Sequence, residues 1–123
     1  MILVDTSVWI DHFRQRDQLL VELLERADVL GHAFVLGEVA CGNLRRRADI
    51  LTLLADLPQA VTATDAEVLE GIERRRLMGR GIGYSDAHLL ASTLLTPGAR
   101  LWTRDLRLAD AARALGVGAV PGH

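Results

Sequence analysis

The stretch ILVDTSVWID, residues 2–11, places a carboxylate directly after a short apolar run. Ile2, Leu3 and Val4 form the brief, β-branched-rich run that is typical of a buried strand in a parallel sheet. Asp5 follows at once. A carboxylate at the end of a core strand is costly unless it is solvated, caps a helix or has a partner. The position of Asp5 therefore raises the question of whether other carboxylates occupy similar places.

Length and composition predict one globular domain. Half of the 123 residues are apolar, which is enough for one hydrophobic core. No apolar run approaches the ~18 residues of a membrane span, and no basic segment precedes an N-terminal apolar stretch, so we expect a cytoplasmic protein without membrane contact. The single cysteine, Cys41, lies in the apolar context VLGEVACG, and we expect a buried, inert thiol.

Short apolar runs alternate with helical patterns along the chain. We therefore expect a single α/β domain over residues 1–123, with a mostly parallel central sheet of about four to five short strands flanked by helices. Strands are expected at 2–4, 60–64, 100–103 and 118–120. Helices are expected at 8–13, 18–30, 33–43, 46–54, 66–78, 85–95 and 106–115, with Ser7, Asp65, and Ser85 or Asp86 as capping residues.

Three further carboxylates share the unusual setting of Asp5. Asp105 follows the strand 100–103 closely, and ligands collect at the carboxyl ends of parallel strands. Glu38 interrupts the apolar segment FVLGEVACG, and Asp86 opens a helix whose other turns are nearly all apolar. Helix capping is an alternative explanation for each aspartate, but Glu38 resists it. Together the four acids predict a shared acidic pocket.

An acidic pocket of this kind requires a cation, because clustered carboxylates repel one another. Oxygen ligands without a histidine or cysteine partner favour Mg²⁺ or Mn²⁺ over zinc. The four histidines, His12, His32, His88 and His123, show no metal-ligand spacing. We expect each of them to be structural or exposed.

Four segments together resemble the PIN domain of VapC-type toxins, the ribonuclease half of type II toxin–antitoxin pairs. They are ILVDTSVWIDHF (2–13), HAFVLGEVACGN (32–43), GIGYSDAHLLAS (81–92) and RLWTRDLRLADAA (100–112), in the order typical of the family. The resemblance extends from Met1 to about Gly116. It implies a PIN fold and a Mg²⁺- or Mn²⁺-dependent endoribonuclease that cleaves RNA with metal-activated water.

The resemblance assigns metal binding and catalysis to the four acids, Asp5, Glu38, Asp86 and Asp105. We take Asp5 and Asp86 as the primary metal ligands, with Glu38 and Asp105 completing the site or orienting water. Two ions would activate the nucleophile and stabilise the leaving oxygen. Whether one ion or two are bound is left open.

Three hydroxyls are expected to hold the carboxylates by hydrogen bonds: Thr6, Ser7 and Thr103. Thr103 corresponds to the hydroxyl that the family carries beside its last acid. The chain departs from the family pattern at Tyr84, where tryptophan is common, and at Arg104, where apolar residues are frequent. Neither departure removes a ligand, but Arg104 could alter the contact with the substrate.

The basic residues fit a phosphate-bearing substrate. All fourteen are arginines, and the chain has no lysine. Guanidinium groups match phosphates bidentately. The triplets at 45–47 and 74–76 are equally well explained by helix ends and solubility, so we assign RNA contact to Arg80, in the glycine-rich loop before Asp86, and to Arg104. With only five aromatic residues, recognition should rest on RNA shape and phosphates rather than on base stacking.

Rival functions from other classes fit the sequence less well. A receiver-like signalling domain usually relies on a lysine, which is absent. A haloacid-dehalogenase-like phosphatase needs a second aspartate two residues after Asp5, where Ser7 stands. A non-catalytic, protein-binding PIN domain would typically have lost an acid. A housekeeping PIN nuclease for RNA maturation or DNA flaps keeps the fold and stays an alternative.

The resemblance also implies protein partners. A toxic nuclease must be held inactive while it is made. We therefore expect a homodimer and a separately encoded VapB-like antitoxin, whose C-terminal segment lies across the acidic pocket and offers a basic side chain to it.

Overall fold

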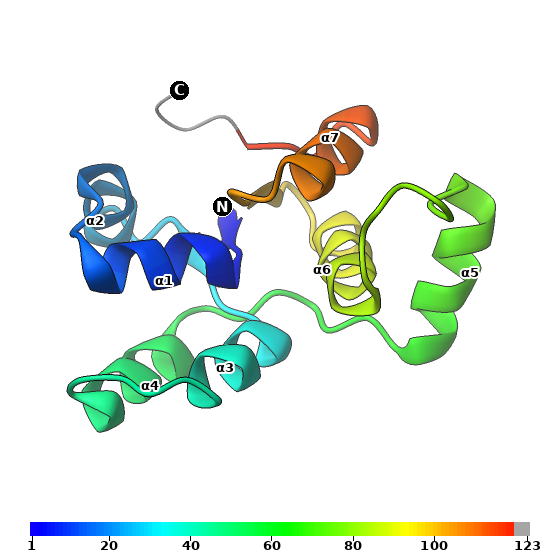
Figure 1. Cartoon of the computed structure of the whole chain (residues 1–123). Helices are drawn as coiled ribbons and strands as arrows, with labels where there is room; N and C mark the ends of the chain where they lie inside the picture. Colours follow the sequence, from blue (N-terminus) through cyan, green and yellow to red (C-terminus); the bar gives the residue numbers. More distant parts are fainter. Residues whose placement is uncertain (120–123) are drawn as a thin grey trace.

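The computed structural model describes residues 1–119, which form a small parallel sheet surrounded by helices (Figure 1). The sheet has the order β2–β1–β3, with β1 at Ile2–Val4, β2 at Val29–Leu30 and β3 at Arg100–Trp102. Both pairings are parallel: Ile2 lies opposite Val29 on one side and Arg100 on the other. The predicted α/β class is confirmed.

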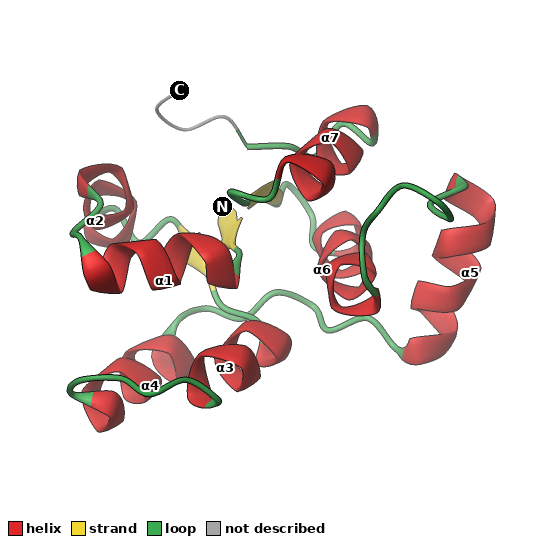
Figure 2. Ribbon diagram, viewed as in Figure 1, coloured by secondary structure: helices red, strands yellow, loops and turns green. Residues whose placement is uncertain are grey.

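Helices occupy the connections between strands, as Figure 2 shows. Helix α6 and helix α7 pack against β3, α1 packs on α3, α3 on α4, and α5 on α6. Among residues 1–119, no helix is both long and apolar enough to cross a membrane. The helices are α1 (Thr6–Arg14), α2 (Gln18–Glu25), α3 (Ala33–Ala40), α4 (Arg47–Asp56), α5 (Asp65–Arg75), α6 (Tyr84–Leu95) and α7 (Leu106–Ala114).

Strand β1 is the centre of the fold because it is hydrogen-bonded on both sides. Leu3 and Val4 are fully buried, as expected of a central parallel strand covered on both faces. Leu101 of β3 and Val29 of β2 are buried beside it. The carboxyl ends of β1 and β3 therefore lie next to each other, and Asp5 and Asp105 follow them.

The sheet is smaller than the predicted four to five strands. Within the described residues, two single parallel bridges, Gly31 with Gln59 and Leu101 with Gly118, stand where further strands were expected. Segment 60–64 is not a strand because hydroxyls of α6 bind its backbone: the N–H of Val61 donates to Thr96 Oγ1 at 2.9 Å, and that of Ala63 to Ser92 Oγ at 3.0 Å. Val120, the end of the last predicted strand, lies outside the described residues, as does His123.

One predicted helix was too long. The apolar pattern of 18–30 continues through Val29 and Leu30, but α2 ends at Glu25 and these two residues form β2. Ala27 adopts φ +56°, in the left-handed region, which terminates a right-handed helix. The apolar residues after this turn therefore belong to the sheet.

Local predictions at two helix ends were also wrong. Cys41 is exposed rather than buried, because it lies at the C-terminal cap of α3, beyond the last buried residue, Val39. Helix α6 begins at Tyr84 with Gly83 as its N-cap, two to three residues earlier than a cap at Ser85 or Asp86 would allow.

Candidate active site

Asp5 lies at the end of β1 and is 7% exposed. Its side chain makes no capping hydrogen bond to α1, so capping does not explain it. Instead, Ser7 Oγ donates to Asp5 Oδ2 at 2.7 Å, and Thr103 Oγ1 donates to the same oxygen at 2.8 Å. Two neutral hydroxyls thus orient this carboxylate and leave its charge uncompensated.

Asp105 occupies the corresponding place after β3 and does cap a helix. Its Oδ1 accepts the backbone N–H groups of Arg107 and Leu108, at 2.9 and 3.1 Å, at the start of α7. Its own N–H donates to Thr103 Oγ1 at 3.1 Å. Thr103 therefore links the backbone of Asp105 to the carboxylate of Asp5.

Glu38 projects from α3 and is exposed, although its sequence neighbours are apolar. Thr6 Oγ1 donates to Glu38 Oε1 at 2.8 Å. Because Thr6 is the first residue of α1, this bond ties α3 to the helix that starts beside Asp5. All three predicted hydroxyls, Thr6, Ser7 and Thr103, thus contact predicted acids.

Asp86 lies in the first turn of α6, where its Oδ2 accepts the N–H of Gly83 at 3.2 Å. Burial raises the pKa of Asp86 above its ordinary value of 3.8, and the negative charges of Asp5, Asp105 and Glu38 raise it further, against the opposing effect of the Gly83 hydrogen bond. All three other acids are therefore close enough for their charges to act on Asp86.

The four acids share two features. Within residues 1–119, none forms an ion pair, and each has one carboxylate oxygen bound to protein donors while the other has no hydrogen-bond partner. In the positions of the described side chains, no three His, Cys, Asp or Glu groups are yet arranged to hold one metal ion. The charges of Asp5, Glu38 and Asp105 act on Asp86, and hydrogen bonds through Thr6 and Thr103 join the elements that carry the other three acids.

The two arginines predicted to contact RNA differ in their surroundings. Arg80 is exposed in the loop before α6. The Arg104 guanidinium instead lies 2.9 Å from Asp11 Oδ2 and 2.6 Å from Asp17 Oδ2, and stacks 5.7 Å from the ring centre of Trp102. The pairing of Arg104 was not predicted, because no local pattern joins it to acids almost ninety positions earlier.

The described histidines lie apart from the four acids. His32 and His88 are buried. His32 Nε2 is 2.8 Å from Ser92 Oγ, and His88 Nε2 is 3.0 Å from Asp65 Oδ1. Burial and the nearby His88 lower the pKa of His32 to about 4, so this ring is neutral at physiological pH. Their contacts are structural, as predicted.

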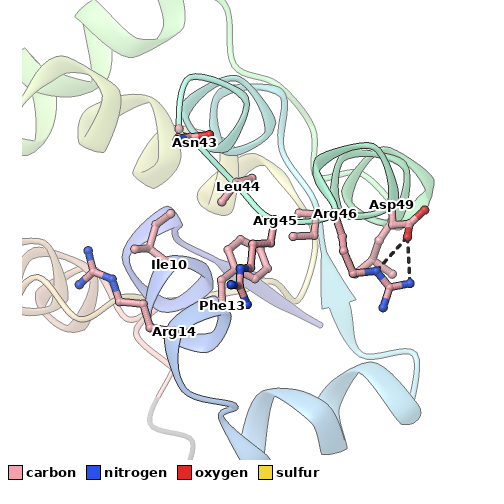
Figure 3. Close-up of a pocket in the computed structure, with 11 residues that line it drawn as sticks. Ile10, Phe13, Arg14, Asn43, Leu44, Arg45, Arg46 and Asp49 are labelled. Carbon is pink, nitrogen blue, oxygen red and sulfur yellow. Dashed lines mark hydrogen bonds and ion pairs between the residues drawn. The ribbon is translucent and has the colours of Figure 1, made fainter.

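A large groove in the described residues lies away from the four acids. It has a volume of about 730 Å³ and runs between α1 and the segment that leads into α4 (Figure 3). Its apolar lining is Ile10, Phe13, Leu44, Ile50 and Leu53. Size alone would select this groove as the functional site. It contains no carboxylate cluster, however, and the chemistry of the acidic site is the stronger criterion.

Comparison with known proteins decides the family. The sequence profile of the PIN domain matches residues 2–114. Two proteins of Mycobacterium tuberculosis, each named Ribonuclease VapC32, from strains CDC 1551 / Oshkosh and ATCC 25618 / H37Rv, are 52% identical to this chain over 117 residues. The alignment covers 95% of this chain and 94% of each relative.

The chain belongs to the VapC family of PIN-domain proteins.

Membership in the VapC family confirms the resemblance that the four sequence segments predicted. It agrees with the parallel α/β fold and with the position of Asp5 and Asp105 at adjacent strand ends. PIN-domain nucleases in general use divalent metal ions. The roles of the individual residues stay predictions.

Proposed function

We propose that this chain is the toxin of a type II toxin–antitoxin system, an endoribonuclease that uses Mg²⁺ or Mn²⁺. One observation carries the proposal: Asp86 and the three acids near it have no ion-pair partner in the described residues, and each keeps one oxygen free. Leaving such charges uncompensated is costly. Family membership and the name of the VapC32 relatives give the reaction class.

The donor set fits a hard divalent cation. The four acids offer carboxylate oxygens, their hydrogen-bond partners are hydroxyls and backbone N–H groups, and within residues 1–119 neither a cysteine nor a histidine hydrogen-bonds to them. Such ligands suit Mg²⁺ or Mn²⁺. When bound, the cation would supply Lewis-acid activation of the attacking water and stabilisation of charge on the phosphate.

The proposed roles of the residues are metal binding and the positioning of the metal-binding carboxylates. Asp5 and Asp86 are the primary ligands, and Glu38 and Asp105 complete the site or orient the attacking water. Ser7 and Thr103 fix Asp5 Oδ2 in place, which leaves Oδ1 free for a ligand. Thr6 positions Glu38 in the same way. Hydrogen bonds to metal-binding carboxylates commonly change metal affinity or activity 10- to 100-fold.

Two arginines, Arg80 and Arg104, are the proposed contacts to RNA. Arg80 is exposed in the loop that leads to Asp86 and is retained as an RNA contact. Contact by Arg104 requires its guanidinium to leave Asp11 and Asp17. Arg104 is therefore the weaker candidate. Recognition through phosphates and RNA shape follows from the scarcity of aromatic residues.

A VapB-like antitoxin is the proposed protein partner. Its C-terminal segment would bring a basic side chain to the four unpaired acids. The groove of Figure 3 offers it a second contact, with an apolar floor and the arginines Arg14 and Arg45 at the rim. An amphipathic segment with acidic residues complements this combination. We further propose a homodimer that acts in the cytoplasm.

The test combines cleavage and growth. Purified protein should cut total bacterial RNA in Mg²⁺ or Mn²⁺ and stop when EDTA is added. Its expression should arrest growth, and co-expression of the product of the adjacent reading frame should relieve the arrest. Cleavage that survives EDTA contradicts the metal site. Cleavage without growth arrest favours the alternative of a housekeeping PIN nuclease.

A further inference from the structure

A basic side chain that the sequence did not single out lies beside the acidic site. Arg107 is the second residue of α7, and its backbone N–H donates to Asp105 Oδ1 at 2.9 Å. Its side chain crosses the loop before α6 at Gly81. A Cβ at Gly81 would lie 2.6 Å from Arg107 Cδ and 2.9 Å from Arg107 Nη1. A side chain at Gly81 would therefore force the Arg107 side chain to shift from this position.

The backbone of Gly81 reinforces this arrangement. Its φ of +79° lies in the left-handed region, which favours glycine. The loop that contains Gly81 ends at Gly83, whose N–H binds Asp86. Arg107 therefore spans the two elements that carry Asp105 and Asp86, with its stem seated on the loop between them.

The Arg107 guanidinium is exposed and, within residues 1–119, has neither a carboxylate partner nor a hydrogen bond. Four other arginines are each paired with an acid: Arg46, Arg74, Arg104 and Arg113. The aliphatic part of the Arg107 side chain thus lies against Gly81, while the N–H groups of its guanidinium have no partner in the described residues. Pre-organisation of this kind reduces the side-chain entropy lost on binding.

The negative charge of an RNA substrate suggests a role for the Arg107 guanidinium. An RNA backbone that approaches four carboxylates is repelled, and a fixed cation at the rim offsets part of that repulsion for a phosphate beside the cleaved bond. Guanidinium groups bind phosphates bidentately. We infer that Arg107, seated on Gly81, is the arginine that positions a backbone phosphate of the RNA at the acidic site, an inference that rests on the proposed function.

The experiment measures binding and cleavage separately. Binding of a fluorescein-labelled RNA hairpin of mixed sequence is followed by anisotropy from low to high KCl, with Ca²⁺ in place of Mg²⁺. Cleavage of total bacterial RNA is followed in Mn²⁺. The variants are Arg107→Ala, Arg107→Lys, Gly81→Ala and Arg104→Ala. The matched control is Arg113→Ala, on the same helix, whose guanidinium is paired with Asp110. Melting curves establish that each variant is folded.

Arg107→Ala should weaken binding about five- to tenfold and reduce the slope of log K against log[KCl] by ~0.7–0.9, the value of one phosphate contact. KM should rise while kcat changes little. Arg107→Lys should restore the slope but not the full affinity, because lysine lacks the bidentate fork. Gly81→Ala should raise KM without removing a charge. Arg104→Ala should change the slope less than half as much as Arg107→Ala.

A slope in Arg107→Ala equal to that of the native protein overturns the inference, as does an equal loss in Arg113→Ala or a larger one in Arg104→Ala. A native protein that shows no salt-dependent binding of the hairpin overturns it as well. Failure of the proposed function has a different signature: native protein that binds the hairpin but leaves all RNA intact in both Mg²⁺ and Mn²⁺.

Discussion

Two groups of acids differ in the partners of their carboxylates. The first group is Asp11 and Asp17, and the second is the four acids of the candidate active site, among them Asp5 and Asp86. Asp11 and Asp17 are paired with Arg104 at 2.9 and 2.6 Å. Asp5 is held only by the hydroxyls of Ser7 and Thr103. A guanidinium neutralises a carboxylate, whereas a hydroxyl orients it and leaves the charge in place.

The pKa shifts of Asp17 and Asp86 have opposite signs. Burial alone would raise the pKa of Asp17, but the N–H of Leu20 and the Arg104 guanidinium together lower it. Burial and the neighbouring carboxylates raise the pKa of Asp86. The ion pairs of Asp11 and Asp17 with Arg104 therefore stabilise the fold. The acids around Asp86 repel one another, and a bound cation would relieve that repulsion. Perturbation of this second kind is typical of functional sites.

The largest expected difference between the groups is in catalysis. Asp5→Asn should reduce RNA cleavage by about three orders of magnitude or more, because it removes a proposed primary metal ligand. Asp11→Asn, which changes an acid already paired with Arg104, should retain most of the activity. Both are measured as kcat/KM in Mn²⁺. Equal kcat/KM values for Asp5→Asn and Asp11→Asn would contradict the proposal that Asp5, but not Asp11, takes part in catalysis.

Replacing a hydroxyl tests whether orientation of Asp5 matters by itself. Thr103→Val removes the donor to Asp5 Oδ2 and the acceptor for the Asp105 N–H while keeping the shape of the side chain. We expect a 10- to 100-fold loss of activity or Mn²⁺ affinity, and recovery in Thr103→Ser. Mn²⁺ affinity is measured by calorimetry. Unchanged affinity and rate in Thr103→Val would remove the positioning role.

Stability without metal should change in opposite directions. Asp86→Asn should raise the melting temperature by a few degrees, about 1 kcal/mol, because repulsion among the acids is relieved. Asp17→Asn should lower it by a similar amount, because it loses an ion pair with Arg104. Added Mn²⁺ should stabilise the native protein by mass action and Asp86→Asn much less. If Asp86→Asn has a lower melting temperature than the native protein, and if Mn²⁺ does not change the melting temperature of the native protein, Asp86 is only a helix cap.

The smallest effect is the pH dependence of these stability differences. The raised pKa of Asp86 means that its contribution to stability is present below the unfolded pKa, near 3.8, and is lost as pH rises through the folded pKa. The advantage of Asp86→Asn should therefore grow as pH rises from 3.8 through the raised folded pKa of Asp86. The lowered pKa of Asp17 means that the penalty of Asp17→Asn is present above 3.8 and disappears as pH falls through the folded pKa. Urea unfolding at several pH values measures both.

The acids were predictable because each violates a local pattern. Asp5 and Asp105 follow apolar strands, and Glu38 interrupts an apolar helix, so the short-range sequence marks all three. The contacts of Thr6 and Ser7 were predictable because both directly follow Asp5, whereas Thr103 was predicted from the resemblance to the family. Their metal-binding roles await the experiments above.

Other features depend on contacts between distant parts of the chain. Segment 60–64 has the composition of a strand, but hydroxyls of α6 some thirty positions later bind its backbone N–H groups. Arg104 is paired with Asp17 across a much longer interval, 87 positions. The seat of Arg107 on Gly81 requires α7 and the loop before α6 to meet in space. A periodicity argument uses near neighbours only and cannot predict such pairings.

The placement of β1 between β2 and β3 has a consequence for synthesis of the protein. Asp5 is made among the first residues, but its donor Thr103 and the partner strand β3 come almost a hundred positions later. At ~5–20 residues per second, translation of that interval takes about 5–20 s. Throughout it the growing chain lacks a side of its central sheet and the last of its four acids. On the proposed function, the active site would stay incomplete until β3 and Asp105 have been made, which would give an antitoxin time to bind before the nuclease is active.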